Sequence, residues 1–240
     1  MVVNLEKYNI LKKTKTKLGN EVSLIGDENI PPNSDISLII GVFHGDEPQG
    51  KFLIEKYLKQ LSSTPTSKSK ISRLGQNPMK KLLFIPCLNP DGMQLGQRTN
   101  ANGVDLNRNF PTKNWGENHG DNATCDDAET AYYGGTSGGS EIETQFLIDT
   151  IREFKPNRIL TLHAPYKVVN YDGPAKELAE KISTIINYPV EASIGYPTPG
   201  SFGTYAGVER QIPTITLELD EEIPVEQLIQ PVFEIFDELL

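Results

Sequence analysis

Runs of apolar residues alternate with amphipathic segments along this chain. Residues 36–42 form an apolar run without polar alternation, which is typical of a strand buried on both faces of a parallel sheet. Further strands are predicted at residues 82–88, 159–162 and 214–217. Strands separated by helical segments indicate an α/β domain.

Amphipathic helices are predicted between these strands. After Pro48, a residue type favoured at the first helical position, apolar residues recur at helical spacing. Ser140 and Glu143 have the spacing of a capping box before a helix through Phe154. Further helices are predicted at residues 174–188 and 224–240, and a hairpin is predicted at residues 10–25.

Composition narrows the classes of function. The 240 residues carry a formal charge of −9 and no basic stripe, which argues against nucleic acid as a partner. No apolar stretch approaches the length of a membrane span, and no signal peptide is visible at the N-terminus. We therefore expect a cytoplasmic enzyme, in which Cys87 and Cys125 are free thiols.

The three histidines of the chain restrict where a metal could bind. His44 and Glu47 directly follow a predicted strand, so they lie at the carboxyl edge of the sheet, where open α/β folds bind ligands. His163 follows another predicted strand in the same way, whereas His119 lies in a polar loop. Two histidines and a glutamate are a common ligand set of catalytic zinc. The tetrapeptide at 44–47 alone also fits an ordinary turn.

A series of motifs resembles the zinc carboxypeptidase family. In the family's order they are HGDE at 44–47, NPDG at 89–92, an arginine at 98, GVDLNRNF at 103–110, LHAP at 162–165 and TLELD at 216–220. NPDG, which we interpret as a turn, and GVDLNRNF are the most specific of them. The resemblance implies a single domain over residues 1–240, with a mixed, largely parallel sheet of about eight strands flanked by helices.

The resemblance also implies roles for individual residues. His44, Glu47 and His163 match the ligands of one Zn²⁺ per chain. Glu218 matches the general base, and Arg98 matches the arginine that polarises the scissile carbonyl. The acidic run that begins at Glu218 could instead be a solvated strand end. However, Glu218 stands between two leucines, and a carboxylate in an apolar strand is costly unless it is paired or metal-linked.

Other matched residues would bind the substrate. Asn107 and Arg108 match the pair that holds the terminal carboxylate, and a guanidinium suits that planar group. The mobile tyrosine that closes over the substrate matches Tyr196, with Tyr205 as the alternative. The family's specificity position falls near Phe202. Each arginine alone would also fit a surface ion pair.

Within the family, the runs at residues 94–111 and 169–175 are most similar to murein tripeptide amidases. The resemblance implies a hydrolase that cleaves the γ-D-Glu–meso-diaminopimelate amide of a small peptide during the recycling of cell-wall peptidoglycan. We expect the loop 111–140 to wall the pocket, because loops of this length are often functional. This loop and residues 168–174 are where contacts to diaminopimelate are expected, and either a monomer or a homodimer is possible.

Three alternatives remain open at this point. A zinc acylase of the aspartoacylase or succinylglutamate desuccinylase kind shares a similar zinc turn, although NPDG favours a peptidase. A metallocarboxypeptidase of different specificity would use the same catalytic residues. A binding module that has lost catalysis is the third, and the presence of every expected polar residue argues against it.

Overall fold

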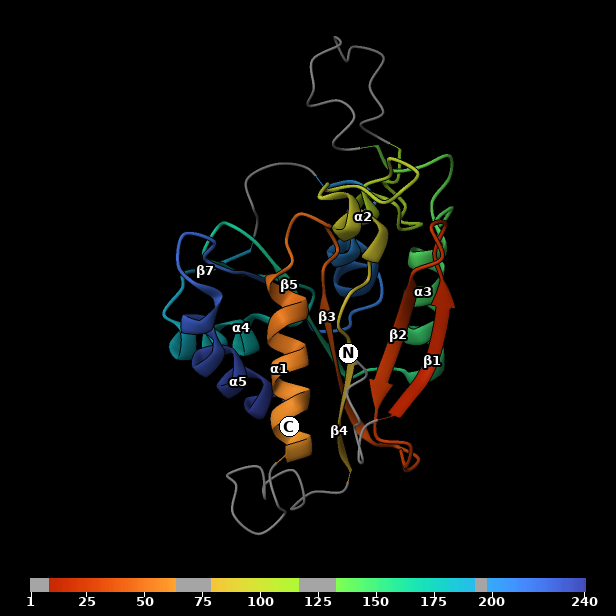
Figure 1. The fold of residues 1–240 in the computed structure, drawn as a ribbon. Helices are drawn as coiled ribbons and strands as arrows, with labels where there is room; N and C mark the ends of the chain where they lie inside the picture. Colours follow the sequence, from red (N-terminus) through yellow and green to blue (C-terminus); the bar gives the residue numbers. More distant parts are fainter. Residues whose placement is uncertain (1–8, 64–78, 117–132, 193–197) are drawn as a thin grey trace.

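The computed structural model describes residues 9–63, 79–116, 133–192 and 198–240. One eight-stranded sheet runs through this part of the chain in the order β1-β2-β4-β3-β5-β8-β6-β7 (Figure 1). The strands are β1 (Asn9–Lys15), β2 (Glu21–Gly26), β3 (Asp35–Gly41), β4 (Lys80–Ile85), β5 (Arg158–His163), β6 (Val168–Asp172), β7 (Val190–Glu191) and β8 (Thr214–Glu218).

The sheet is mixed and largely parallel, as expected. The pairs β3–β4, β3–β5, β5–β8 and β6–β7 are parallel, whereas β1–β2, β2–β4 and β6–β8 are antiparallel. The predicted N-terminal hairpin is the β1–β2 pair at one edge. The central strands are apolar on both faces because helices cover them on both sides.

Helices form a layer on each face of the sheet (Figure 1). The helices on the faces are α1 (Gln49–Ser63), α3 (Ile142–Phe154), α4 (Lys176–Ile186) and α5 (Ile229–Glu238), while the short helix α2 (Pro90–Leu95) lies beyond the strand ends. One apolar cluster joins α1, α4 and α5 to one face, and a second joins α3 to the other. None of the helices in the described part of the chain is long and apolar enough to span a membrane.

Side-chain alternation on β5, β6 and β8 divides the apolar core from a polar surface. Leu162, Val169 and Leu217 belong to the cluster that contacts α1, α4 and α5. Their chain neighbours His163, Asn170 and Glu218 point to the opposite face, because successive residues of a strand alternate. The three polar residues line one pocket, so the carboxyl end of the central sheet carries the candidate chemistry.

The predicted capping box at α3 is wrong. Glu141, not Ser140, is the N-cap residue of α3, and its side chain makes no capping hydrogen bond. The Ser140 hydroxyl accepts a hydrogen bond from Asn109 Nδ2 at 3.0 Å and donates to Glu141 Oε1 at 2.6 Å. Ser140 is therefore engaged by the loop around Asn109 instead of by the first turn of the helix.

The interpretation of NPDG as a turn is also wrong, because these residues begin the short helix α2. Asn89 caps it by accepting a hydrogen bond from Gly92 N at 2.9 Å, and Pro90 occupies its first position. β4 ends at Ile85, which places Cys87 beyond the strand but still buried. The helix that Pro174 was expected to open begins at Lys176.

The C-terminal helix is divided in two. A 3₁₀ turn, η5 (Val225–Leu228), precedes α5, and Pro231 lies in the first turn of α5. Proline is tolerated at this position because the N–H groups of the first helical turn have no partner within the helix, and the helix predicted over residues 224–240 therefore begins as an α-helix only at Ile229. His119 and Cys125 lie outside the described residues.

Candidate metal centre and substrate pocket

The turn after β3 carries the first two candidate ligands, His44 and Glu47. This turn packs directly on α2, where a Cβ on Gly45 would overlap the backbone of Gly92 and Met93. Gly45 N also donates to Arg98 O at 3.2 Å. Only glycine permits this close approach, so the packing on α2 sets the position of the turn and of its two ligands.

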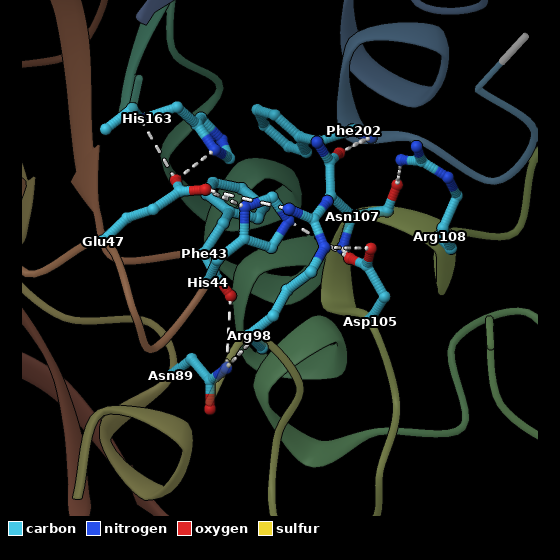
Figure 2. A network of polar contacts seen from close by, with 11 residues as sticks. Phe43, His44, Glu47, Asn89, Arg98, Asp105, Asn107, Arg108, His163 and Phe202 are labelled. Carbon is cyan, nitrogen blue, oxygen red and sulfur yellow. Dashed lines mark hydrogen bonds and ion pairs between the residues drawn. The ribbon is translucent and has the colours of Figure 1, made fainter. Parts of the chain in front are cut away.

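Three side chains converge at the end of the central strands (Figure 2). Glu47 Oε1 lies 2.7 Å from His44 Nδ1, and Glu47 Oε2 lies 3.0 Å from His163 Nδ1. Candidate donor atoms of His44, Glu47 and His163 all lie within 4.8 Å of one another. Both histidines are almost fully buried. The structure therefore brings together the three residues that the sequence singled out as metal ligands.

Two imidazoles and one carboxylate fit a catalytic zinc site. Such sites take three protein ligands and keep one position for water or substrate. The three residues fit this set in chemistry and in spacing. They face a pocket of about 330 Å³, so a fourth position would be reachable from the solvent side.

Asp105 lies beside the candidate metal ligands, although the sequence analysis gave it no role. Its carboxylate is fully buried and lies between the imidazole of His44 and the guanidinium of Arg98 (Figure 2). Asp105 Oδ1 is 3.2 Å from His44 Nε2, and Oδ2 accepts a hydrogen bond from Arg98 Nε at 3.0 Å. Carboxylates that bond the second nitrogen of a metal-binding histidine orient its ring. Its place inside GVDLNRNF was the only available signal.

The charges around the candidate metal site favour the ionised forms of the carboxylates of Glu47 and Asp105. Burial alone would raise the pKa of Glu47 and Asp105, but the neighbouring histidines hold both values far below their usual range, with Arg98 adding to the effect at Asp105. Burial alone would lower the pKa of His44, but the carboxylates of Asp105 and Glu47 raise it to about 9. The two acids therefore stay ionised and paired throughout the neutral range.

Glu218 reaches the site from the neighbouring parallel strand. His163 and Glu218 are register partners on β5 and β8, so their side chains leave the same edge of the sheet. Glu218 Oε2 is buried and has no hydrogen-bond partner among the described residues. Burial raises the pKa of Glu218 above its usual value. A desolvated carboxylate with a free oxygen beside the candidate ligands is suited to accept a proton.

The cationic part of the pocket comes from Arg98 and the 3₁₀ turn η2 (Leu106–Arg108). Arg98, Asn107 and Arg108 line the same pocket as the candidate ligands. Arg108 Nη1 donates to Asn107 O at 2.7 Å, and Asn107 Oδ1 accepts from Phe202 N at 2.9 Å. Seven of the eight predicted site residues thus lie around one pocket.

The eighth residue, Tyr196, lies outside the described residues. Its alternative, Tyr205, is 1% exposed, and its ring contacts the ring of Phe110 and the guanidinium of Arg210. Tyr205 is a core residue in this arrangement and does not line the pocket. Phe202, expected near the specificity position, is also in the aromatic core, where it packs on Phe43 and Phe110.

The loop expected to wall the pocket contributes no lining residue from its described ends, 111–116 and 133–140. A Cβ on Gly134 would touch Arg108 O, so this end of the loop packs behind the arginine. Residues 117–132 lie outside the described part of the chain. From the segment 168–174, by contrast, Asn170 and Asp172 line the pocket.

Comparison with known proteins agrees with this geometry. Residues 14–234 match the sequence profile of zinc carboxypeptidases. The chain belongs to the zinc carboxypeptidase family. This confirms the resemblance in the motifs, and the match covers nearly all of the described sheet and all of the candidate site.

Relatives within the family are similar over much of the chain. Murein peptide amidase A of Escherichia coli (strain K12) is 36% identical over 171 residues, which cover 70% of this chain and 64% of that protein. The chain therefore spans slightly less than two thirds of that relative in the alignment. Murein peptide amidase A of Vibrio campbellii is 41% identical over 140 residues, 56% of this chain and 55% of the relative.

Solved structures show the same fold. The murein-tripeptide amidase MpaA from Escherichia coli O157 has a TM-score of 0.74 and 28% sequence identity, and the match covers 97% of this chain and 91% of that one. Thrombin activatable fibrinolysis inhibitor has a TM-score of 0.71 at 16% identity, covering 96% of this chain and 69% of that one. The second likeness concerns the fold alone.

Proposed function

We propose that this member of the zinc carboxypeptidase family is a zinc-dependent amidase that removes the C-terminal residue from a short peptide. The observation that supports this most strongly is the convergence in one pocket of His44, Glu47 and His163 with Glu218 and two arginines. Each part of an amide hydrolysis is represented there.

The metal end of the pocket would activate water. Zinc held by His44, Glu47 and His163 would supply a Lewis acid that lowers the pKa of a bound water to about 7. Glu218 would accept a proton from the attacking water and deliver it to the leaving amine, since it lines the same pocket and its Oε2 has no hydrogen-bond partner among the described residues. Asp105 would hold the ring of His44 in the orientation that ligation needs.

The arginines would bind the two oxygen-rich parts of the substrate. Arg98 lies beside Glu47, with 3.8 Å between Nη1 and Oε1, and would stabilise negative charge on the scissile carbonyl oxygen. Arg108 and Asn107 would hold the terminal carboxylate. Binding of that carboxylate limits cleavage to the last residue. Tyr196 stays our prediction for the tyrosine that closes over the substrate.

For the substrate, we infer the γ-D-Glu–meso-diaminopimelate amide of murein tripeptide, cleaved in the cytoplasm during peptidoglycan recycling. The names of the relatives from Escherichia coli and Vibrio campbellii support this substrate. The similarity of the fold to MpaA over 97% of the chain supports it further. The acylase alternative would require the pocket to release acetate or succinate instead.

One assay separates these possibilities. Purified protein, reconstituted with zinc, is incubated with synthetic L-Ala-γ-D-Glu-meso-diaminopimelate and, separately, with N-acetyl and N-succinyl amino acids. We expect release of diaminopimelate, loss of activity on chelation, and one zinc per chain by metal analysis. Release of acetate or succinate without diaminopimelate would contradict the proposal.

A further inference from the structure

The pocket continues from the metal end along β6, where Asp172 is the last residue of the strand. Asp172 is the register partner of Thr214, four residues before Glu218 on β8. Four residues correspond to roughly 13 Å along a strand. Asn170 and Thr216 line the pocket between these two positions and are register partners themselves. The acid at position 172 therefore lies well away from the candidate metal ligands.

Glycines hold open the space that this acid occupies. Asp172 packs against η4 (Gly203–Val208), a single π-helical turn. A Cβ on Gly203 would overlap Asp172 Oδ2, and a Cβ on Gly207 would overlap Asp172 Cβ. The carboxylate thus lies where a side chain of residue 203 would otherwise be. Gly203 lines the pocket as well, so the two residues form one wall of this end of the pocket.

Asp172 has no hydrogen bond and no ion pair among the described residues. Both arginines of the pocket are engaged elsewhere, Arg98 with Asp105 and Arg108 with the backbone of Asn107. Burial raises the pKa of Asp172 to about 6. A half-buried carboxylate without a partner is costly, and a cationic ligand group would remove that cost by pairing with it.

We propose that Asp172 selects the departing residue by pairing with a primary ammonium group on its side chain. This rests on the proposed function, in which Asn107 and Arg108 hold the α-carboxylate of that residue. With the α-carboxylate and the scissile amide held at those positions, the side chain is the part of the departing residue that can extend along β6. Diaminopimelate and lysine both carry an ammonium on the fourth side-chain carbon.

Two peptides that differ only by this amine test the proposal. The first is L-Ala-γ-D-Glu-meso-diaminopimelate, and the second ends in L-2-aminopimelate, which keeps the distal carboxylate but lacks the distal amine. We expect the zinc-loaded wild type to prefer the first peptide by about 100-fold in kcat/KM, the scale expected for a desolvated charge pair. In Asp172→Asn this ratio should fall to near one.

Two further variants make the result specific. Gly203→Ala adds a Cβ where the carboxylate lies, so it should displace Asp172 and also lower the ratio. Asp149→Asn makes the same change of charge on α3, where the carboxylate is 58% exposed and pairs with Arg152. Asp149 does not line the pocket, and this variant should keep the wild-type ratio.

Each outcome decides for or against the role of Asp172. A D172N protein that retains the wild-type ratio overturns it, and so does one that loses activity on both peptides equally, because a purely structural role would do that. Retention of the wild-type ratio by G203A would also count against it. A wild type that cleaves neither peptide would instead overturn the proposed function.

Discussion

The pKa values of buried carboxylates are shifted in opposite directions at the two ends of the pocket. At the metal end, Glu47 and Asp105 lie between His44, His163 and Arg98, and these partners hold the pKa of both acids below its usual range despite burial. At the β6 end, Asp172 has no such partner among the described residues, and burial raises its pKa to about 6.

At the metal end the protein itself supplies the partners of the buried carboxylates, whereas at the β6 end the partner of Asp172 would have to come from a ligand. Opposite charges at the metal end already stabilise one another, which keeps the ligands oriented before a metal or substrate arrives. The carboxylate of Asp172 carries an unrelieved desolvation cost, which a substrate can offset only by supplying a cation. Catalytic residues and selecting residues should therefore respond differently to substitution.

Glu218 lies at the metal end but, like Asp172, has a pKa that burial raises. Its substitution is expected to have the largest effect on turnover. One of its oxygens is buried without a hydrogen-bond partner in the described part of the chain, yet Glu218 lies beside the candidate ligands. Glu218→Gln should lower turnover of the tripeptide by about 10²- to 10⁴-fold, the usual contribution of a general base. Zinc content and the Kd of the tripeptide should stay close to wild type, as measured by metal analysis and calorimetry.

A matched control for this variant is Glu222→Gln, on the exposed segment after β8. Glu222 is 79% exposed and pairs with Lys167 at 2.9 Å, so its loss should leave turnover unchanged. Full activity in the Glu218 variant would show that another group accepts the proton. Loss of zinc from that variant would mean that Glu218 acts as a ligand.

The contrast between the two ends predicts that substitution of Asp105 affects metal affinity, whereas substitution of Asp172 affects substrate preference. Asp105→Asn removes the charge that orients His44, and loss of such a partner costs about 10- to 100-fold in metal affinity. Asp172→Asn should leave metal affinity as in the wild type and change only the preference for the amine. Competition with a chelating dye measures the first property.

If both variants weakened zinc binding equally, the two ends would not be separate units. If D105N bound zinc like the wild type, the orienting role of Asp105 would be wrong. Because Asp105 also bonds Arg98, we expect D105N to lower turnover in addition. That loss should persist when zinc is saturating.

The candidate ligands could be predicted from sequence because each follows an apolar strand. A parallel sheet brings the carboxyl ends of its strands to one edge, so His44 and His163 were expected at the same edge, and the pairing of β3 with β5 makes them neighbours there. The register of β5 with β8 then sets Glu218 beside His163. The apolar runs therefore predict the strands and the edge at which the ligands lie, whereas the structure supplies the strand order.

Asp105 and Asp172 could not be assigned in this way. Asp105 belongs to a loop, and its contact with His44 spans 61 positions of the sequence. The role of Asp172 depends on the room left by Gly203, which is a feature of packing between β6 and η4. The capping box failed for a similar reason, since Asn109, far away in the chain, holds Ser140.

The same contrast recurs outside the pocket, at the start of α3, where no substrate is involved. Glu141 accepts hydrogen bonds from Asn100, Asn102 and Ser140. Burial alone would raise the pKa of Glu141, but these hydrogen bonds keep it below its usual value. Glu143 is 1% exposed, and its contact to Asn100 is a long 3.4 Å. Burial raises the pKa of Glu143 from 4.5 to about 7.

The smallest expected effect is a change in the pH dependence of stability, and it tests directly whether burial raises the pKa of an acid in this protein. Because the folded state holds the proton of Glu143 more tightly than the unfolded state, Glu143 should lower stability progressively as pH rises from about 4.5 to about 7. Glu143→Gln should remove this dependence and stabilise the protein by roughly 1 kcal/mol at pH 8, since glutamine retains part of the cost of burial. Glu141→Gln should destabilise it at the same pH. Thermal unfolding of both variants between pH 4 and 8 measures this, and an unchanged pH slope in E143Q would show that burial does not raise the pKa of Glu143.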